Sequence, residues 1–206
     1  LTTDAVGNVS PALSAFVLGI DTSAPAAPTV TAQTTNDTTP VITGTAVLAA
    51  GETLSVTVGG ATYTVVPAAG GAWSLDLGTA TPAGGSLTAL SDGAVSVTAT
   101  VRDAAGNATS DTTSSELQID TTPPAVPTVA TLTTSDTSPV ISGTATLASG
   151  ETLRVSVNGA TYSVTPASDG SWSLDLQTAT PVSGTLGAFA NNTSYPVTAV
   201  ARDAAG

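Results

Sequence analysis

The chain contains two copies of one sequence. The stretch 21–90 recurs with few changes at 120–189, and GTAVLAAGETLSVTVGGATYTVVPA at 44–68 corresponds to GTATLASGETLRVSVNGATYSVTPA at 143–167. A period of roughly 99 residues is the size of a whole domain, so the repetition predicts a tandem array. We expect a first repeat at 21–119 and a second at 120–206 that lacks its last strand. Residues 1–20 correspond to the C-terminal strand region of a preceding repeat.

Composition narrows the function classes. An apolar fraction of 41% allows each copy to bury a core, and without cysteine no disulfide can join them. Fifteen acidic residues against three arginines and no lysine give a net charge of −12. This charge argues against nucleic acid and anionic lipid as partners. With no apolar run near 18 residues and no signal or lipidation motif, we also expect no membrane insertion.

Alternating and β-branched runs bounded by Gly, Pro, Asn or Asp predict short strands. They are 128–132, 139–146, 152–157, 160–166, 171–176 and 195–202, with 114–119 supplied by the first copy. Gly59–Gly60 and Asn158–Gly159 suit tight hairpins, and SDG at 168–170 is a further hairpin candidate. Helices are limited to a turn or two in 83–92 and 182–192. The predicted fold class is all-β, with tandem seven-stranded immunoglobulin-like β-sandwiches in an elongated array.

Alternation also predicts the core. The inward-facing positions are Leu54, Val56, Val58, Trp73, Leu75, Leu77, Val95, Val97, Ala99, Val101, Leu117 and Ile119. Trp73 and Trp172 could stack on sugars, but each begins an inward-facing set, so core packing is favoured.

The acidic residues gather in turns and linkers. If successive strands alternate in direction, the loops carrying Glu151, Asp169 and Asp203 lie where the chain enters the second domain, beside Asp120 of the linker. Asp37 of the first domain faces the same junction. Clustered carboxylates repel one another unless a cation such as Ca²⁺ binds them. The competing interpretation is that each Asp is only a turn-forming and solubilising residue.

We therefore predict calcium ligands in four groups, with Ca²⁺ as the only cofactor. Asp37, Asp120 and Asp203 form the internal junction, and Asp21, Asp103 and Asn107 form the entry pole of the first domain. Glu52 and Glu151 rank second, and Asp4 and Asn8 are the equivalents in the preceding repeat. Asp169 has no acidic counterpart in the first copy and is expected to be a hairpin residue.

Several phrases carry a family resemblance. DxAGN, DTTPP, SDTSPVISGTA, GETLRVSVNG and DGSWSLDL resemble the bacterial immunoglobulin-like tandem repeats of giant, type I-secreted RTX-type surface adhesins. The resemblance implies a secreted protein at the bacterial cell surface that serves adhesion and biofilm formation. It also implies calcium near domain junctions and repeats that extend a terminal adhesive domain away from the cell.

These observations predict a structural extender that calcium at the junctions makes rigid, and whose partners are the neighbouring repeats. The alternative is a carbohydrate- or protein-binding immunoglobulin-like module. We expect no enzyme, since without histidine and cysteine the Ser–His, Cys–His and histidine–metal centres cannot form. The offset frame has two interpretations: a fragment of a longer array, or head-to-tail strand complementation in which 14–20 of one chain completes the second domain of the next.

Overall fold

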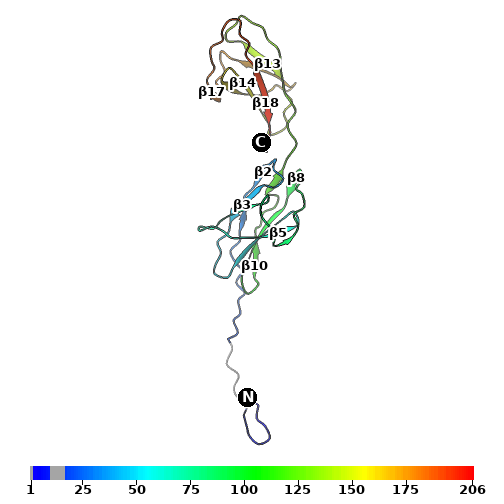
Figure 1. Cartoon of the computed structure of the whole chain (residues 1–206), viewed down its shortest axis with the longest axis vertical. Helices are drawn as coiled ribbons and strands as arrows, with labels where there is room; N and C mark the ends of the chain where they lie inside the picture. The colour runs from blue at the N-terminus through cyan, green and yellow to red at the C-terminus, as the bar shows by residue number, and fades with distance from the viewer. Residues whose placement is uncertain (1, 10–16) are drawn as a thin grey trace.

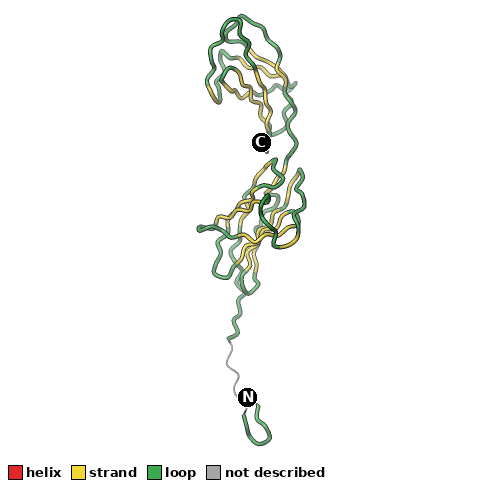
Figure 2. Tube along the Cα trace, in the orientation of Figure 1, coloured by secondary structure: helices red, strands yellow, loops and turns green. Residues whose placement is uncertain are grey.

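The chain folds into strands and loops. The computed structural model describes residues 2–9 and 17–206, and within these it contains no helix (Figure 2). The predicted helical turns at 83–92 and 182–192 are therefore wrong. Each connection holds a two-residue strand instead, β7 (Gly84–Gly85) or β17 (Ser183–Gly184). Gly85 and Gly184 have φ values of 72° and 73°, which a right-handed helix does not allow.

Strands β1 to β11 form the first unit as three sheets. One sheet has the order β1 (Thr29–Val30), β3 (Val41–Thr45), β6 (Ala72–Asp76). The next has the order β10 (Ala108–Ser110), β9 (Val97–Arg102), β4 (Thr53–Val58), β5 (Ala61–Val65), β7. The third has the order β2 (Gln33–Thr35), β11 (Leu117–Ile119), β8 (Gly93–Val95).

The second unit repeats two of these sheets. They have the orders β12 (Thr128–Val129), β13 (Val140–Thr144), β16 (Ser171–Asp175) and β17, β15 (Ala160–Val164), β14 (Thr152–Val157), β18 (Val197–Arg202). The register is also repeated, because β3 pairs Ile42 with Leu75 and β13 pairs Ile141 with Leu174. Figure 1 shows the two units following one another along the long axis.

The predicted strands are correct in place but too long at sheet edges. The run at 152–157 coincides with β14, whereas 128–132 contains only the two residues of β12 and 114–119 only the three of β11. The first unit contains more than seven strands, because short strands at the edges of its sheets are present in addition to the longer ones. The hairpins at Gly59–Gly60 and Asn158–Gly159 are confirmed by positive φ values of 54°, 83°, 43° and 88°. SDG at 168–170 is a turn between β15 and β16, which belong to different sheets, and so is not a hairpin.

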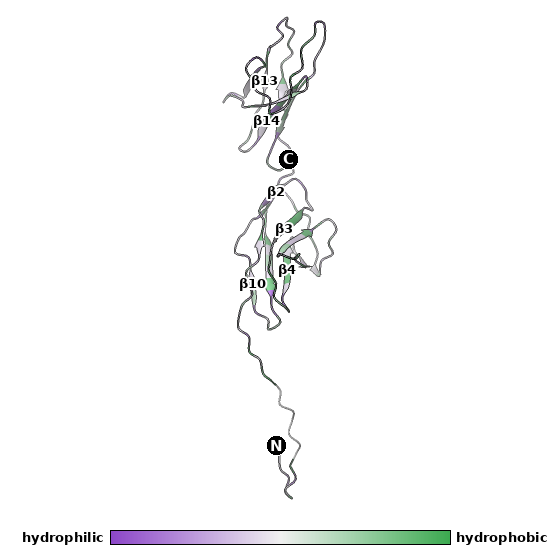
Figure 3. Ribbon diagram, turned by 90° about the vertical axis from the view of Figure 1, so that its left-hand side faces the viewer, coloured by the Kyte–Doolittle hydropathy of each residue, from purple (hydrophilic) through white to green (hydrophobic). Residues whose placement is uncertain are grey.

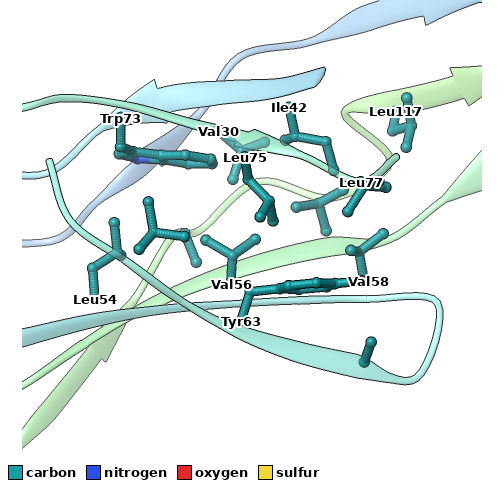
Figure 4. Close-up of a cluster of buried hydrophobic side chains, with 14 of the residues drawn as sticks. Val30, Ile42, Leu54, Val56, Val58, Tyr63, Trp73, Leu75, Leu77 and Leu117 are labelled. Carbon is teal, nitrogen blue, oxygen red and sulfur yellow. The ribbon is translucent and has the colours of Figure 1, made fainter. Parts of the chain in front are cut away.

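Each unit has its own core of small aliphatic residues around one Trp and one Tyr. All predicted core residues of the first unit are buried except Val95, which lies half-buried on the edge strand β8. Trp73 and Trp172 are both buried, which confirms core packing. Figure 4 shows Leu117 near Ile42 and Leu77, at the end of the cluster away from Leu54. Hydrophobic positions are green in Figure 3, on strands such as β3 and β4.

The third sheet of the first unit has no counterpart among the described residues of the second. Residues 132–134 and 193–195 correspond to β2 and β8, yet they have no strand structure. β11 is the central strand that pairs with both β2 and β8 in the first unit. Without an equivalent central strand, neither edge has a partner with which to form hydrogen bonds.

Candidate functional site

The loop 103–107 folds around a single carboxylate. Oδ1 of Asp103 accepts hydrogen bonds from the N–H of Gly106 at 2.7 Å and of Asn107 at 2.8 Å, and its Oδ2 accepts one from Nδ2 of Asn107 at 2.8 Å. Gly106 has a φ of 100°, which allows the chain to turn. The Asn107 side chain, followed by the loop N–H groups, lowers the pKa of Asp103.

The same loop forms at the start of the chain. Asp4 accepts hydrogen bonds from the N–H of Val6 at 3.0 Å, the N–H of Asn8 at 2.9 Å and Nδ2 of Asn8 at 2.8 Å. The Asn8 side chain is the main cause that lowers the pKa of Asp4. Local sequence is therefore sufficient to form this turn, and the first role of both aspartates is to hold their own loop.

Three of the predicted ligands come together at the entry pole of the first unit. Nδ2 of Asn107, which binds Asp103, also donates a hydrogen bond to the carbonyl oxygen of Asp21 at 3.1 Å. The Asp21 side chain accepts a hydrogen bond from the N–H of Ser23 at 2.9 Å. Asn107 thus links the 103–107 loop to the segment by which the chain enters.

At the internal junction, two of the predicted ligands are hydrogen-bonded to the same residue, Thr35. The N–H of Asp120 donates to the carbonyl oxygen of Thr35 at 3.0 Å, and the N–H of Asp37 donates to Oγ1 of Thr35 at 3.1 Å. Asp203, the third predicted ligand, accepts hydrogen bonds within its own loop, from the N–H groups of Ala205 and Gly206 at 2.9 and 2.8 Å.

The second-rank ligands and Asp169 also bind their own loops. Glu52 accepts a hydrogen bond from the N–H of Ala49, and Glu151 accepts one from the N–H of Ala148, each at 2.8 Å. Asp169 accepts hydrogen bonds from the N–H and hydroxyl of Ser171, as a turn residue does.

Within residues 2–9 and 17–206, no three carboxylates form a group that could hold a metal ion. The loops provide carboxylates and backbone carbonyl oxygens, which are the hard ligands that Ca²⁺ uses. Calcium binding at either pole stays a prediction.

Sequence analysis missed Asp92. Its carboxylate accepts hydrogen bonds from the N–H of Thr121 at 2.9 Å, the hydroxyl of Thr121 at 2.6 Å and the hydroxyl of Thr122 at 2.8 Å. These bonds, led by that of the Thr121 side chain, lower the pKa of Asp92. The linker that leaves the first unit is therefore fastened to it. The only available signal was a difference between the copies, since the second has Asn191–Asn192 in this region.

The second unit contains an open groove of about 800 Å³. It lies between 132–134 and 193–195, the segments that correspond to β2 and β8. Its lining combines Thr, Ser and Asn residues with hydrophobic ones, namely Val129, Ile141, Val157, Phe189 and Val197. The Phe189 and Tyr195 rings meet edge to face, with centroids 4.8 Å apart. The corresponding space in the first unit is occupied by β11, whose Leu117 and Ile119 are completely buried.

The strands and two packed cores define an all-β immunoglobulin-like sandwich protein. A model of the bacterial Ig-like domain family matches residues 16–121, and the chain belongs to that family. No curated protein matches. None of the described segments is a helix long and apolar enough to cross a membrane.

Among the solved structures similar to this chain is one from a study described as structural insight into host cell surface retention of a 1.5-MDa bacterial ice-binding adhesin. The two share 24% identity with a TM-score of 0.37, and the match covers 89% of this chain. The chain spans 65% of the length of that one. At this TM-score, the likeness carries no argument about function.

Proposed function

We propose that this chain is part of the extender region of a bacterial cell-surface adhesin and has a mechanical role. The observation that carries the proposal is the fastening of the linker to the first unit. Asp120 is bonded through its N–H to Thr35, and Thr121 and Thr122 are bonded to Asp92. A linker held in this way transmits orientation from one unit to the next, as a spacer requires.

The linker sequence supports the same role. Residues 121–127 read TTPPAVP, and each proline fixes its own φ angle and restricts the residue before it. The free part of the linker is therefore short and stiff. Repetition of one domain with such a linker increases length without adding a new binding site, which suits an extender.

Several observations weigh against a sugar-binding module. Trp73, Trp172, Tyr63 and Tyr162 are all buried, so none of these rings offers a face for stacking. A catalytic role is also disfavoured, because the carboxylates are spread over separate loops, and those of Glu52, Asp103 and Asp203 each accept hydrogen bonds from the backbone of their own loop.

We further propose that calcium makes the junctions rigid. A divalent cation supplies a positive charge that carboxylates from different segments can share. Asp37 and Asp120, which share Thr35 as a hydrogen-bonding neighbour, would bind from the first unit and the linker, and Asp203 from the second unit. At the entry pole, Asp21 and Asp103 would bind with Asn107 between them. A secreted protein at the cell surface is exposed to calcium, so the state with bound ion would be the working one.

Small-angle scattering and thermal melting with calcium or with a chelator test this proposal. We expect a larger maximum dimension and a higher melting temperature with calcium, because an ion that binds only the folded, aligned state stabilises it. Asp120→Asn should reduce both responses, whereas the matched change Asp169→Asn, in a turn of the second unit, should leave them intact. Identical dimensions and melting temperatures in both conditions would refute calcium binding.

The extender role has a separate test. Without calcium, the chain should still give the scattering profile of an elongated molecule. It should also bind no sugar on a glycan array. A saturable, sugar-specific signal on the array would favour the binding-module alternative, whatever the calcium experiment shows.

A further inference from the structure

The hairpin between β14 and β15 is joined to the segment 185–189 through one residue. Nδ2 of Asn158 donates hydrogen bonds to the carbonyl oxygens of Gly187 at 2.7 Å and Ala188 at 3.2 Å. The N–H of Gly187 donates to the carbonyl oxygen of Asn158 at 2.9 Å. We call these three hydrogen bonds the Asn158 clamp. They hold the loop that leads to Phe189, which packs against the core of the second unit.

The first unit joins the corresponding segments in a different way. Asn158 corresponds to Gly59, whose carbonyl oxygen accepts a hydrogen bond from the N–H of Thr88 at 2.7 Å. The space beside Gly59 is filled by Leu87 and Leu90, since an added Cβ would lie 2.8 and 3.1 Å from their side chains. The backbone bond is therefore common to both units, whereas the side-chain bonds of the clamp belong to the second.

The clamp includes the one Asn–Gly pair of the chain, Asn158–Gly159. Glycine has no Cβ to shield its backbone nitrogen, so this nitrogen can approach the side-chain carbon of the residue before it. Gly159 is exposed in the hairpin turn, and among the described residues its N–H has no hydrogen-bond partner. A free backbone nitrogen and a side-chain amide therefore lie on adjacent residues at a place that water reaches.

We propose that Asn158 is a site of spontaneous deamidation, which opens the clamp permanently. The Gly159 nitrogen loses its proton and bonds to Cγ of Asn158, while Nδ2 takes up a proton and leaves as ammonia. Water then opens the cyclic imide at one of its two carbonyl carbons, which gives aspartate or isoaspartate at this position. Water is the only co-reactant, and the modification is independent of the proposed extender role.

The product cannot form the clamp again. The asparagine amide provides two N–H donors, whereas an ionised carboxylate only accepts hydrogen bonds. A carboxylate at this position would place a negative charge against the carbonyl oxygens of Gly187 and Ala188, which repel it. Isoaspartate also adds an atom to the main chain of a two-residue turn, whose length sets the register of β14 and β15. The segment 185–189 then loses its side-chain attachment to the hairpin.

The clamp controls how fast this reaction proceeds. Its two side-chain bonds direct the amide toward Gly187 and Ala188, and Cγ has to turn away from them before the Gly159 nitrogen can reach it. Reaction therefore follows local opening of the clamp. The packing is tight, because a Cβ added at Gly187 would lie 3.0 Å from Nδ2 and 3.2 Å from Cγ of Asn158. A side chain at this position would push the amide out of the clamp.

Incubation of the 206-residue chain at mildly alkaline pH, followed by peptide mass spectrometry, tests the proposal. We expect conversion of the amide to an acid at Asn158 ahead of every other asparagine. Gly187→Ala should accelerate the conversion by roughly tenfold, because it opens the clamp. Gly84→Ala is the matched control, because a Cβ there would meet no atom within 4 Å, and it should leave the rate unchanged.

Hydrogen exchange measures the release of the segment. The N–H of Gly187 should exchange roughly tenfold faster in Asn158→Asp than in the unchanged chain. Incubation should move the unchanged chain toward the Asn158→Asp pattern. Asn158→Gly introduces the residue found at Gly59 and removes the reactive amide, so its exchange pattern should not change during incubation.

Three results would overturn the proposal. If Asn158 stays unconverted in the folded chain while a peptide of residues 155–162, VSVNGATY, converts in the same buffer, the hairpin is not a modification site. Equal conversion rates in Gly187→Ala and Gly84→Ala would show that the clamp does not control the reaction. Exchange at Gly187 that is the same in Asn158→Asp and in the unchanged chain would show that the segment is not released.

Discussion

The carboxylate of Asp92 accepts two hydrogen bonds from Thr121, one from its N–H at 2.9 Å and one from its hydroxyl at 2.6 Å, across 29 residues of sequence. Thr122 adds a third through its hydroxyl. These bonds hold the start of the linker against the loop before β8. The direction in which the linker leaves the first unit therefore depends on one acidic side chain.

Asp92→Ala should release the linker. We expect a wider distribution of inter-unit orientations, seen in small-angle scattering as a smaller mean radius of gyration, with little change in the melting temperature of either unit. Asp169→Ala is the matched control, because it removes a similar turn carboxylate that does not touch the linker. An Asp92→Ala scattering profile identical to that of the unchanged chain would mean that the prolines alone set the linker direction.

The pH dependence of the 103–107 loop follows from the lowered pKa of Asp103. Because its folded pKa is below the ordinary value of 3.8, this carboxylate stabilises the fold fully above that value. The stabilisation is lost as the pH falls from 3.8 through the folded pKa. An NMR titration of the Asp103 carboxyl should give a midpoint below 3.8, and Asn107→Ala should move it upward, since the Asn107 side chain is the largest cause of the shift.

The Asp4 carboxyl provides an internal comparison in the same titration. Its pKa is lowered chiefly by Asn8, so Asn107→Ala should leave the Asp4 midpoint unchanged. If both midpoints moved together in that variant, the lowered pKa of Asp103 would not come from its local hydrogen bond with Asn107.

Gly44 and Gly143 should tolerate no side chain, because each lies directly against the ring of a buried Trp. A Cβ added at Gly44 would clash with the carbonyl oxygen of Thr29 and lie 2.5 Å from Cζ2 of Trp73, and one added at Gly143 would clash with the carbonyl oxygen of Thr128 and lie 2.6 Å from Cζ2 of Trp172. Gly143→Ala should lower the free energy of unfolding of the second unit by about 1–3 kcal/mol or more, from overpacking. Chemical denaturation followed by Trp fluorescence measures this.

Gly84→Ala is the control for that experiment. Gly84 also lies in a strand, but a Cβ there would meet no atom within 4 Å. A Gly143→Ala chain as stable as the Gly84→Ala chain would show that both the Trp172 ring and the Thr128 backbone can move without cost.

The polar pair at Gln33 and Glu116 should lower the stability of the first unit. Glu116 is buried with both carboxylate oxygens unpaired, and Nε2 of Gln33 is buried without a partner. The double change Gln33→Leu and Glu116→Val introduces the residues that occupy the corresponding positions of the other repeats, Leu132 and Val17. It should raise the free energy of unfolding by about 1–3 kcal/mol, because neither position then leaves a buried polar atom without a hydrogen-bond partner. An unchanged or lower value in chemical denaturation would indicate that bound water satisfies the pair.

Much of the fold could be predicted from the sequence. Strict alternation in a run such as Leu54, Val56 and Val58 decides both the strand and its buried face, because one face of the sheet meets the core. Strand ends could not be placed in the same way. The lengths of β11 and β12 are set by how many residues of the neighbouring strands form hydrogen bonds with them. Those neighbours lie far away in the sequence.

The candidate site could be predicted only in part. The pairing of Asp103 with Asn107 is local, so its spacing in the sequence was sufficient, and the contact of Asn107 with Asp21 follows from the repeat. The role of Asp92 depends on a contact across 29 residues that no local pattern marks. Glu52 and Glu151 show the reverse case. Each lies in a loop near a pole, but its carboxylate accepts a hydrogen bond from the backbone of its own loop.

The parallel pairing of β2 with β11 determines how the first unit responds to tension. β2 lies near the start of the unit and β11 at its end, with Gln33 beside Leu117 and Thr35 beside Ile119. When the two ends are pulled apart, the strands are drawn in opposite directions along their length. Their hydrogen bonds are then loaded together in shear and do not open one at a time. Such a pair resists stretching more strongly than an unzipping hairpin, and in the described part of the second unit no strand pair has this geometry.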